Sequence, residues 1–211
     1  MKKPLDSQRK SPKQSRSKAI VDSIFDATIR ILPKIGSEHI TTKKIADLAG
    51  ISIGSLYQYF PNKESVLGAI IDAGVSASLM DFEKKLSEID GRSMKESTDM
   101  MIDFALALFL KEKEKVREIY RKAPELGRLP ALLKTRQATV NRLAIEMKKH
   151  DPGQPEHEYV RVSFIAVNLV MGVILTMLLD PLQSYTVDEL SYELKSMLNA
   201  YFKDRSMRSS P

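Results

Sequence analysis

Apolar side chains at helical spacing organise almost the whole sequence. They recur at steps of three and four from Ile20 to Phe202, and no segment shows the alternation of a half-buried strand. Clusters of proline, glycine and aspartate interrupt the pattern. We therefore predict an all-α chain with a first helix from residue 18 to about 34, three short helices up to about 74, and further helices over 76–89, 94–112, 114–122, 128–149, 156–179 and 186–203.

Chain length and cysteine content exclude several classes of protein. A chain of 211 residues can bury roughly 70% of its unfolded surface, so a disulfide-stapled miniprotein is excluded. The absence of cysteine removes thiol nucleophiles, cysteine metal ligands and disulfides, and it fits a reducing cytoplasm. We predict a globular protein of the cytoplasm.

The excess positive charge lies on one N-terminal segment. Residues 1–18 hold seven basic side chains and one acid, which accounts for the whole net charge of +6. The segment has no apolar face to bury, so we expect residues 1–17 to form a disordered basic arm. Such an arm fits a solubility tail, a targeting peptide or a ligand of polyanions, whereas a secretory signal is excluded because no apolar region follows.

Signals for two short helices lie close together before residue 62. Thr41 or Thr42 is a suitable N-cap for the first helix, Gly50 ends it, and Ser52 caps the second. Asn62 caps the helix that follows. Two short helices joined by a tight turn and flanked by amphipathic helices form the layout of a helix-turn-helix DNA reader.

The second short helix leaves a small, neutral face once its core positions, Leu56 and Phe60, are set aside. The remaining positions are Ser52, Ile53, Gly54, Ser55, Tyr57, Gln58 and Tyr59. Small residues permit close approach to base edges, and tyrosine hydroxyls suit phosphates. Lys63 begins the next helix, where free backbone N–H groups favour an anion, and it is predicted to clamp a phosphate.

The segment TTKKIADLAGISIGSLYQYFPNKE, residues 41–64, closely resembles the signature of the tetracycline-repressor (TetR) family. The resemblance extends over residues 18 to about 72 and is only architectural beyond residue 80. It implies a homodimeric, cytoplasmic and nucleoid-associated regulator, usually a repressor, that leaves its operator when a small molecule binds. The implied domains are a three-helix DNA-binding domain over 18–74, a helical ligand-binding and dimerisation domain over 75–205, and a tail over 206–211.

Taken residue by residue, the resemblance implies DNA contacts from Thr42, Lys43, Ser52, Ile53, Gly54, Ser55, Tyr57, Gln58, Tyr59 and Lys63. Ile53 departs from members with a polar side chain at that position and offers only apolar contact, such as to a thymine methyl. Simple packing is the alternative for both tyrosines, and Tyr57 is expected to lean on the core more than Tyr59.

The predicted reading domain does not carry the charge that attracts DNA. Residues 19–72 hold five basic and six acidic side chains. We therefore hypothesise that the basic arm supplies much of the nonspecific attraction, by entering the minor groove beside an inverted-repeat operator.

One later segment, residues 162–179, has eighteen consecutive residues without a charge, which is the lower limit for a membrane span. Polar residues interrupt it and no aromatic belt accompanies it, which favours a buried or intersubunit helix. We predict homodimerisation through residues 157–179 and 186–203 as a four-helix bundle, and a membrane-associated helical protein remains the alternative.

The sequence says little about an effector. A small hydrophobic molecule is expected from the resemblance, and a cavity for it would draw on Met101, Phe104, Phe109, Leu133, Asn168 and Met171. The same residues equally fit a filled core. If the chain binds DNA, the alternative to an effector-released repressor is an activator or a regulator that has no small-molecule effector.

Signals for catalysis are absent from the sequence. The three histidines have no triad or ligand spacing, and no phosphate-binding or nucleophile-elbow motif occurs. The acidic and histidine residues over 150–158 are more typical of a solvated helix junction than of a metal site. We predict no catalytic residue, no metal and no cofactor.

Overall fold

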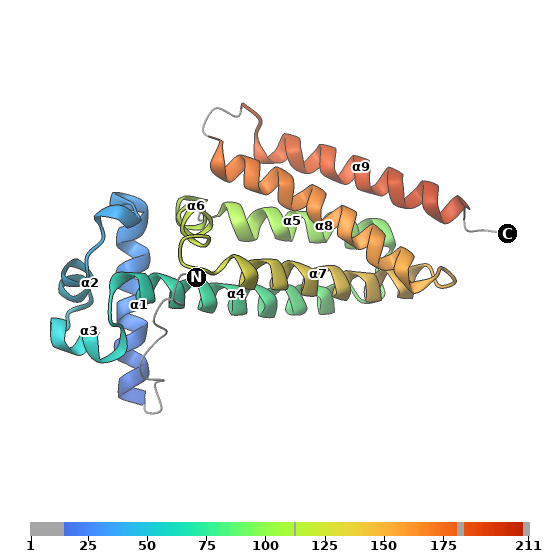
Figure 1. Cartoon of the computed structure of the whole chain (residues 1–211). Helices are drawn as coiled ribbons and strands as arrows, with labels where there is room; N and C mark the ends of the chain where they lie inside the picture. The colour runs from blue at the N-terminus through green and yellow to red at the C-terminus, as the bar shows by residue number, and fades with distance from the viewer. Residues whose placement is uncertain (1–14, 112, 181–183, 209–211) are drawn as a thin grey trace. The chain divides into compact units, whose positions relative to one another are not determined.

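The computed structural model describes residues 15–111, 113–180 and 184–208, and within them it is helical and without strands. The predicted all-α class is confirmed. The elements of Figure 1 are α1 (Ser15–Ile35), a 3₁₀ turn η1 (Ser37–His39), α2 (Thr42–Ala49), α3 (Ile53–Tyr59), α4 (Lys63–Glu88), α5 (Met94–Leu110), α6 (Lys113–Lys122), α7 (Leu129–His150), α8 (Glu156–Leu179) and α9 (Val187–Arg208).

Three helix boundaries differ from the prediction. The helix α1 begins at Ser15, so the last residues of the predicted arm are helical, while residues 1–14 of the arm lie outside the described range. The predicted helices before and after residue 75 are one helix, α4, because Gly74 alone does not interrupt helical backbone. The helix α9 continues to Arg208, into the predicted tail, whose residues 209–211 are not described.

The chain divides into two compact units. Unit 1 comprises residues 1–76 and 114–132, and unit 2 comprises residues 77–113 and 133–211. The sequence placed residues 114–132 in the C-terminal domain, but in the structure they pack with the N-terminal helices. Apolar packing is the cause, because Ala123 and Leu126 are buried in the same hydrophobic cluster as the core residues of α1–α4.

The core of unit 1 fixes the two short helices against α1 and α4. Ile24, Ile45, Leu56 and Phe60 are fully buried, and each such side chain contributes about 1.5–3 kcal/mol. The rings of Phe25 and Phe60 lie 6.0 Å apart in a tilted arrangement. Burial on both α2 and α3 therefore holds the pair as one body.

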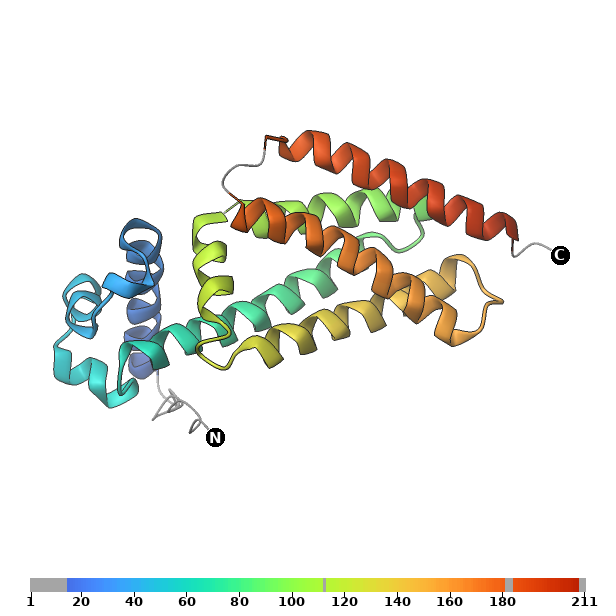
Figure 2. The same ribbon diagram turned by 45° about the horizontal axis from the view of Figure 1, so that its top comes forward.

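Unit 2 is a bundle in which α5 packs along α8 and α9 (Figure 2). Its α8 buries Val162, Ile174 and Leu178, while Phe164 and Ile165 on the same helix stay about half exposed.

By length and composition alone, α4 and α8 are each long and apolar enough to cross a membrane.

Candidate functional site

Side-chain caps and one glycine set the geometry of the turn between α2 and α3. Of the two threonines considered, Thr41 is the cap, and its Oγ1 accepts from the backbone N–H of Lys44 at 3.2 Å. Ser52 caps α3 in the same way, 3.0 Å from the N–H of Ser55. Gly50 between them has φ 69° and ψ 30°, a left-handed conformation that favours glycine. The predicted caps and stop at this turn are confirmed.

The two tyrosines of α3 are placed in the reverse of the expected order. Tyr57 is 43% exposed, and its hydroxyl lies 3.1 Å from Oγ1 of Thr42 on α2. Tyr59 is only 5% exposed. The cause is helical spacing, because Leu56, Tyr59 and Phe60 stand at i, i+3 and i+4 and share the buried stripe. A DNA contact from Tyr59 remains a prediction that its burial does not favour.

The exposed face at the start of α3 is chemically apolar. The hydroxyls of Ser52 and Ser55 hydrogen bond to each other at 2.8 Å, and Ser52 is also occupied as the cap. Ile53 beside them is 40% exposed. A Cβ added to Gly54 would meet nothing closer than 3.8 Å, so the fold itself does not require glycine there. The face therefore presents an aliphatic side chain and bare backbone.

Two lysines converge on the carbonyl groups of η1. Lys44 on α2 donates to the carbonyl of His39 at 3.0 Å. Lys63 at the start of α4 donates to the carbonyls of Ser37 and Glu38, each at 3.2 Å. The predicted phosphate clamp thus lies at a helix N-terminus as expected, with its ammonium held by the chain's own backbone. Lys43 and Gln58 are exposed.

The helix α6 supports η1 from a distant part of the sequence. Glu118 is 8% exposed, and its Oε2 accepts from both the backbone N–H and the hydroxyl of Ser37 at 3.3 Å. Lys122 pairs with Glu38, and this hydrogen bond and charge lower the pKa of the Glu38 carboxyl. Sequence reasoning missed this support because 81 residues separate Glu118 from its partner and no local pattern joins them.

A second contact ties the segment after α6 to α4. Nε of Arg128 lies 3.0 Å from Oδ1 of Asp72. Its guanidinium also lies over Gly68, where an added Cβ would approach to 3.1 Å. The missing side chain at Gly68 therefore permits this close approach. Together with Glu118, Arg128 attaches residues 114–132 to the helices of unit 1.

The six residues predicted to line an effector cavity lie in different surroundings. Met101 and Phe104 pack against the cluster of Phe82, Leu86 and Ile89, as in a filled core. The other four are spread over partly or largely exposed positions. Leu133 is 44% exposed, the Asn168 amide donates to the Phe164 carbonyl within α8 at 2.7 Å, and Phe109 and Met171 are half-buried.

Residues 24–70 match the model of a family described as bacterial regulatory proteins, tetR family. The chain is also 32% identical over 79 residues to the HTH-type transcriptional repressor KstR of Mycobacterium tuberculosis. That segment covers 37% of this chain and 35% of KstR, so the match spans about a third of the curated relative.

Solved structures extend the likeness to the whole fold. A Mesorhizobium loti protein described as a TetR-family transcriptional regulator has a TM-score of 0.75 at 15% identity, over 90% of this chain and 98% of that one. The fatty acid degradation regulator FadR from Bacillus halodurans has a TM-score of 0.68 at 18% identity, over 89% and 96%. These relatives give no support to a membrane-associated helical protein. Residues 24–70 of this chain are thus similar to the tetR family of bacterial regulatory proteins, and the chain shares its fold with these solved structures.

Proposed function

We propose that this protein is a sequence-specific, DNA-binding transcriptional regulator of the cytoplasm, a homodimeric repressor that a small molecule releases from its operator. The observation that carries the proposal is the face of α3. Ile53 and Gly54 are exposed and Ser55 is half-buried, and together they form a small surface at the start of a helix that its core holds rigidly. Such a helix start is the part of a helix-turn-helix that contacts base edges in the major groove.

The residues around this face suit the DNA backbone. The Thr42–Tyr57 hydroxyl pair bridges α2 and α3, and either hydroxyl can donate to a phosphate oxygen. Lys43 is exposed beside it. Lys63 can exchange its backbone carbonyl partners for a phosphate at the N-terminus of α4. The proposed contacts therefore combine backbone positioning with readout by α3.

Exposed apolar side chains on the last two helices support the homodimer. Phe164 and Ile165 on α8 are 47% and 46% exposed, and Tyr192 and Met197 on α9 are 71% and 55% exposed. Pairing of residues 157–179 and 186–203 with those of a second copy would remove this surface from water. A two-fold dimer would present two α3 helices to an inverted repeat with half-sites about 34 Å apart.

The test is selection of bound duplexes from a random DNA pool at two salt concentrations. We expect an inverted repeat to be enriched by the wild-type chain and by Met80→Asp, which changes a side chain that is 73% exposed on α4. The matched variant Ile53→Asp on α3 should enrich nothing. Salt-sensitive binding without an enriched sequence, or equal enrichment by Ile53→Asp, would contradict the proposal.

A further inference from the structure

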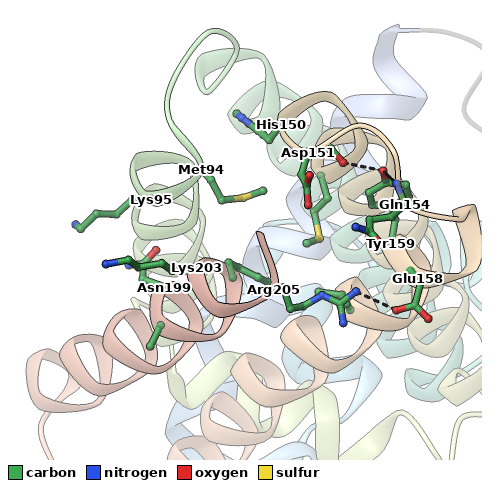
Figure 3. A pocket seen from close by; sticks show the side chains of 14 residues that line it. Met94, Lys95, His150, Asp151, Gln154, Glu158, Tyr159, Asn199, Lys203 and Arg205 are labelled. Atoms are coloured by element: carbon green, nitrogen blue, oxygen red, sulfur yellow. Dashed lines mark hydrogen bonds and ion pairs between the residues drawn. The ribbon is translucent and has the colours of Figure 1, made fainter. Parts of the chain in front are cut away.

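Unit 2 contains a cavity of about 650 Å³ where the starts of α5 and α8 meet the ends of α7 and α9 (Figure 3). Its volume lies within the range of small-molecule sites, which is roughly 300–1,000 Å³. None of the six residues predicted from the sequence to contact an effector is in its wall. The cavity is therefore a separate candidate for a ligand site.

Each of the four helices contributes an apolar side chain to the wall. These are Met94 from α5, Met147 from α7, Val162 from α8 and Phe202 from α9. Val162 is buried at 1% exposure, so the deepest part of the wall is aliphatic. Thioether side chains adapt to the shape of an apolar ligand at little cost.

Two of the acidic or basic groups at the cavity wall, Glu158 and Lys95, are paired within the chain. The Glu158 carboxylate accepts from Arg205 at 2.9 Å and from Arg161 at 2.5 Å. Lys95 pairs with Asp99 at 2.7 Å. The Asp151 carboxylate at the wall forms no ion pair within the described residues, so an anionic ligand would meet an uncompensated like charge.

Two further polar side chains are present at the wall. His150 and Gln154 each carry side-chain atoms that can donate or accept a hydrogen bond. The Tyr159 hydroxyl is already used, because it donates to the Asp151 carbonyl at 2.7 Å and accepts from the Gln154 N–H at 2.9 Å. These two hydrogen bonds hold the loop that carries Gln154 in place.

We propose that this cavity binds a mainly apolar small molecule that carries a hydroxyl or carbonyl group and no anionic group. The apolar body lies against Met94, Met147 and Val162, and the polar group meets His150 or Gln154. This proposal rests on the proposed function in one respect: the molecule bound in the cavity would be the effector that releases the repressor from its operator. Binding at the cavity is measured without DNA, so failure of the operator selection leaves this test intact.

The test uses two fluorescent probes with one aromatic frame. N-phenyl-1-naphthylamine is uncharged, and 1-anilinonaphthalene-8-sulfonate is the same frame with an anionic group. We expect the neutral probe to bind the wild-type chain saturably, at one per chain, and the sulfonate to bind about tenfold more weakly. Equal affinity for the two probes, or no saturable binding of the neutral one, would overturn the proposal.

Paired variants locate the binding. Met94→Trp fills the cavity from α5 and should weaken the neutral probe by about tenfold or more. Met80→Trp makes the same change at a 73% exposed position on α4 outside the wall and should bind as the wild type does. Loss of binding in both variants, or in neither, would count against the cavity.

A measurement on the unaltered chain guards against a misfolded variant. With ¹³C-methyl methionine, addition of the neutral probe should shift the methyl resonances of Met94 and Met147 and leave that of Met80 unchanged. Shifts confined to other methionines would place the probe elsewhere and overturn the proposal.

Discussion

At the residue scale, we expect Ile53 to determine which kind of base edge α3 can recognise. Its side chain is exposed and has no hydrogen-bonding group, and the neighbouring serine hydroxyls bond to each other. We expect a thymine methyl to be its contact. Replacing that thymine with uracil in the selected operator should weaken wild-type binding by about fourfold per contacted base, the value of one buried methyl group.

The control for this prediction is the variant Ile53→Ala. It should bind the operator more weakly than the wild type and respond less to the exchange of thymine for uracil. A uracil operator that the wild type binds as tightly as the thymine operator would show that Ile53 reads no methyl group. Fluorescence anisotropy titrations at one fixed salt concentration measure all four combinations.

Gly54 gives a second residue-scale prediction, in which stability and binding change in opposite directions. The space around it accepts a Cβ, and glycine within a helix costs about 0.5–1 kcal/mol relative to alanine. Gly54→Ala should therefore raise the free energy of unfolding by about that amount in a urea titration. The same methyl group should weaken operator binding by about tenfold, because it holds the helix away from the bases.

At the scale of elements, α6 is predicted to stabilise the turn that holds Lys63. Glu118→Ala removes the acceptor of the buried Ser37 N–H, and an unpaired buried donor costs about 1–3 kcal/mol. We expect a lower free energy of unfolding and weaker operator binding. Glu118→Gln keeps an acceptor oxygen and should lose less of both. Equal unfolding midpoints for the wild type and Glu118→Ala would contradict this role.

The ion pair between α8 and α9 gives a prediction about pH. The hydrogen bond from Arg205 lowers the pKa of Glu158 below its ordinary value of 4.5, so the pair stabilises the fold above that pH. This stabilisation is lost as the pH falls through the lowered pKa. Arg205→Gln should melt at a lower temperature than the wild type at pH 7, and the difference should shrink as the pH falls below 4.5. Arg161→Gln removes the other arginine beside Glu158, within α8, and should show a smaller difference of the same sign.

At the scale of the whole molecule, the charge distribution predicts how binding responds to salt. The excess positive charge lies before residue 19, and the reading segment 19–72 holds six acids against five bases. Deleting residues 1–14 should weaken DNA binding and reduce the salt slope by about 0.9 for each lysine or arginine that contacts a phosphate. An unchanged slope in titrations over a range of salt concentrations would refute a role for the arm.

The sequence by itself determined the helical fold class and the helix-turn-helix, because both depend on local chemistry. The stop at Gly50 follows from a left-handed backbone conformation, and the cap at Ser52 satisfies an N–H three residues away. Apolar spacing likewise placed the middle and late helices to within a few residues. The continuity of α4 was the exception, because two helices were predicted where the structure has one from Lys63 to Glu88.

Only the tertiary structure decided which side chains those helices expose and which distant segments meet. Tyr57 was expected to pack against the core more than Tyr59, but the packing of α3 against the rest of unit 1 buried Tyr59 instead. Glu118 and Ser37 are joined across 81 residues, and four helix ends form the cavity beside Met94. These contacts depend on the three-dimensional path of the chain, and a periodic pattern in one sequence holds no information about the partner of a buried group.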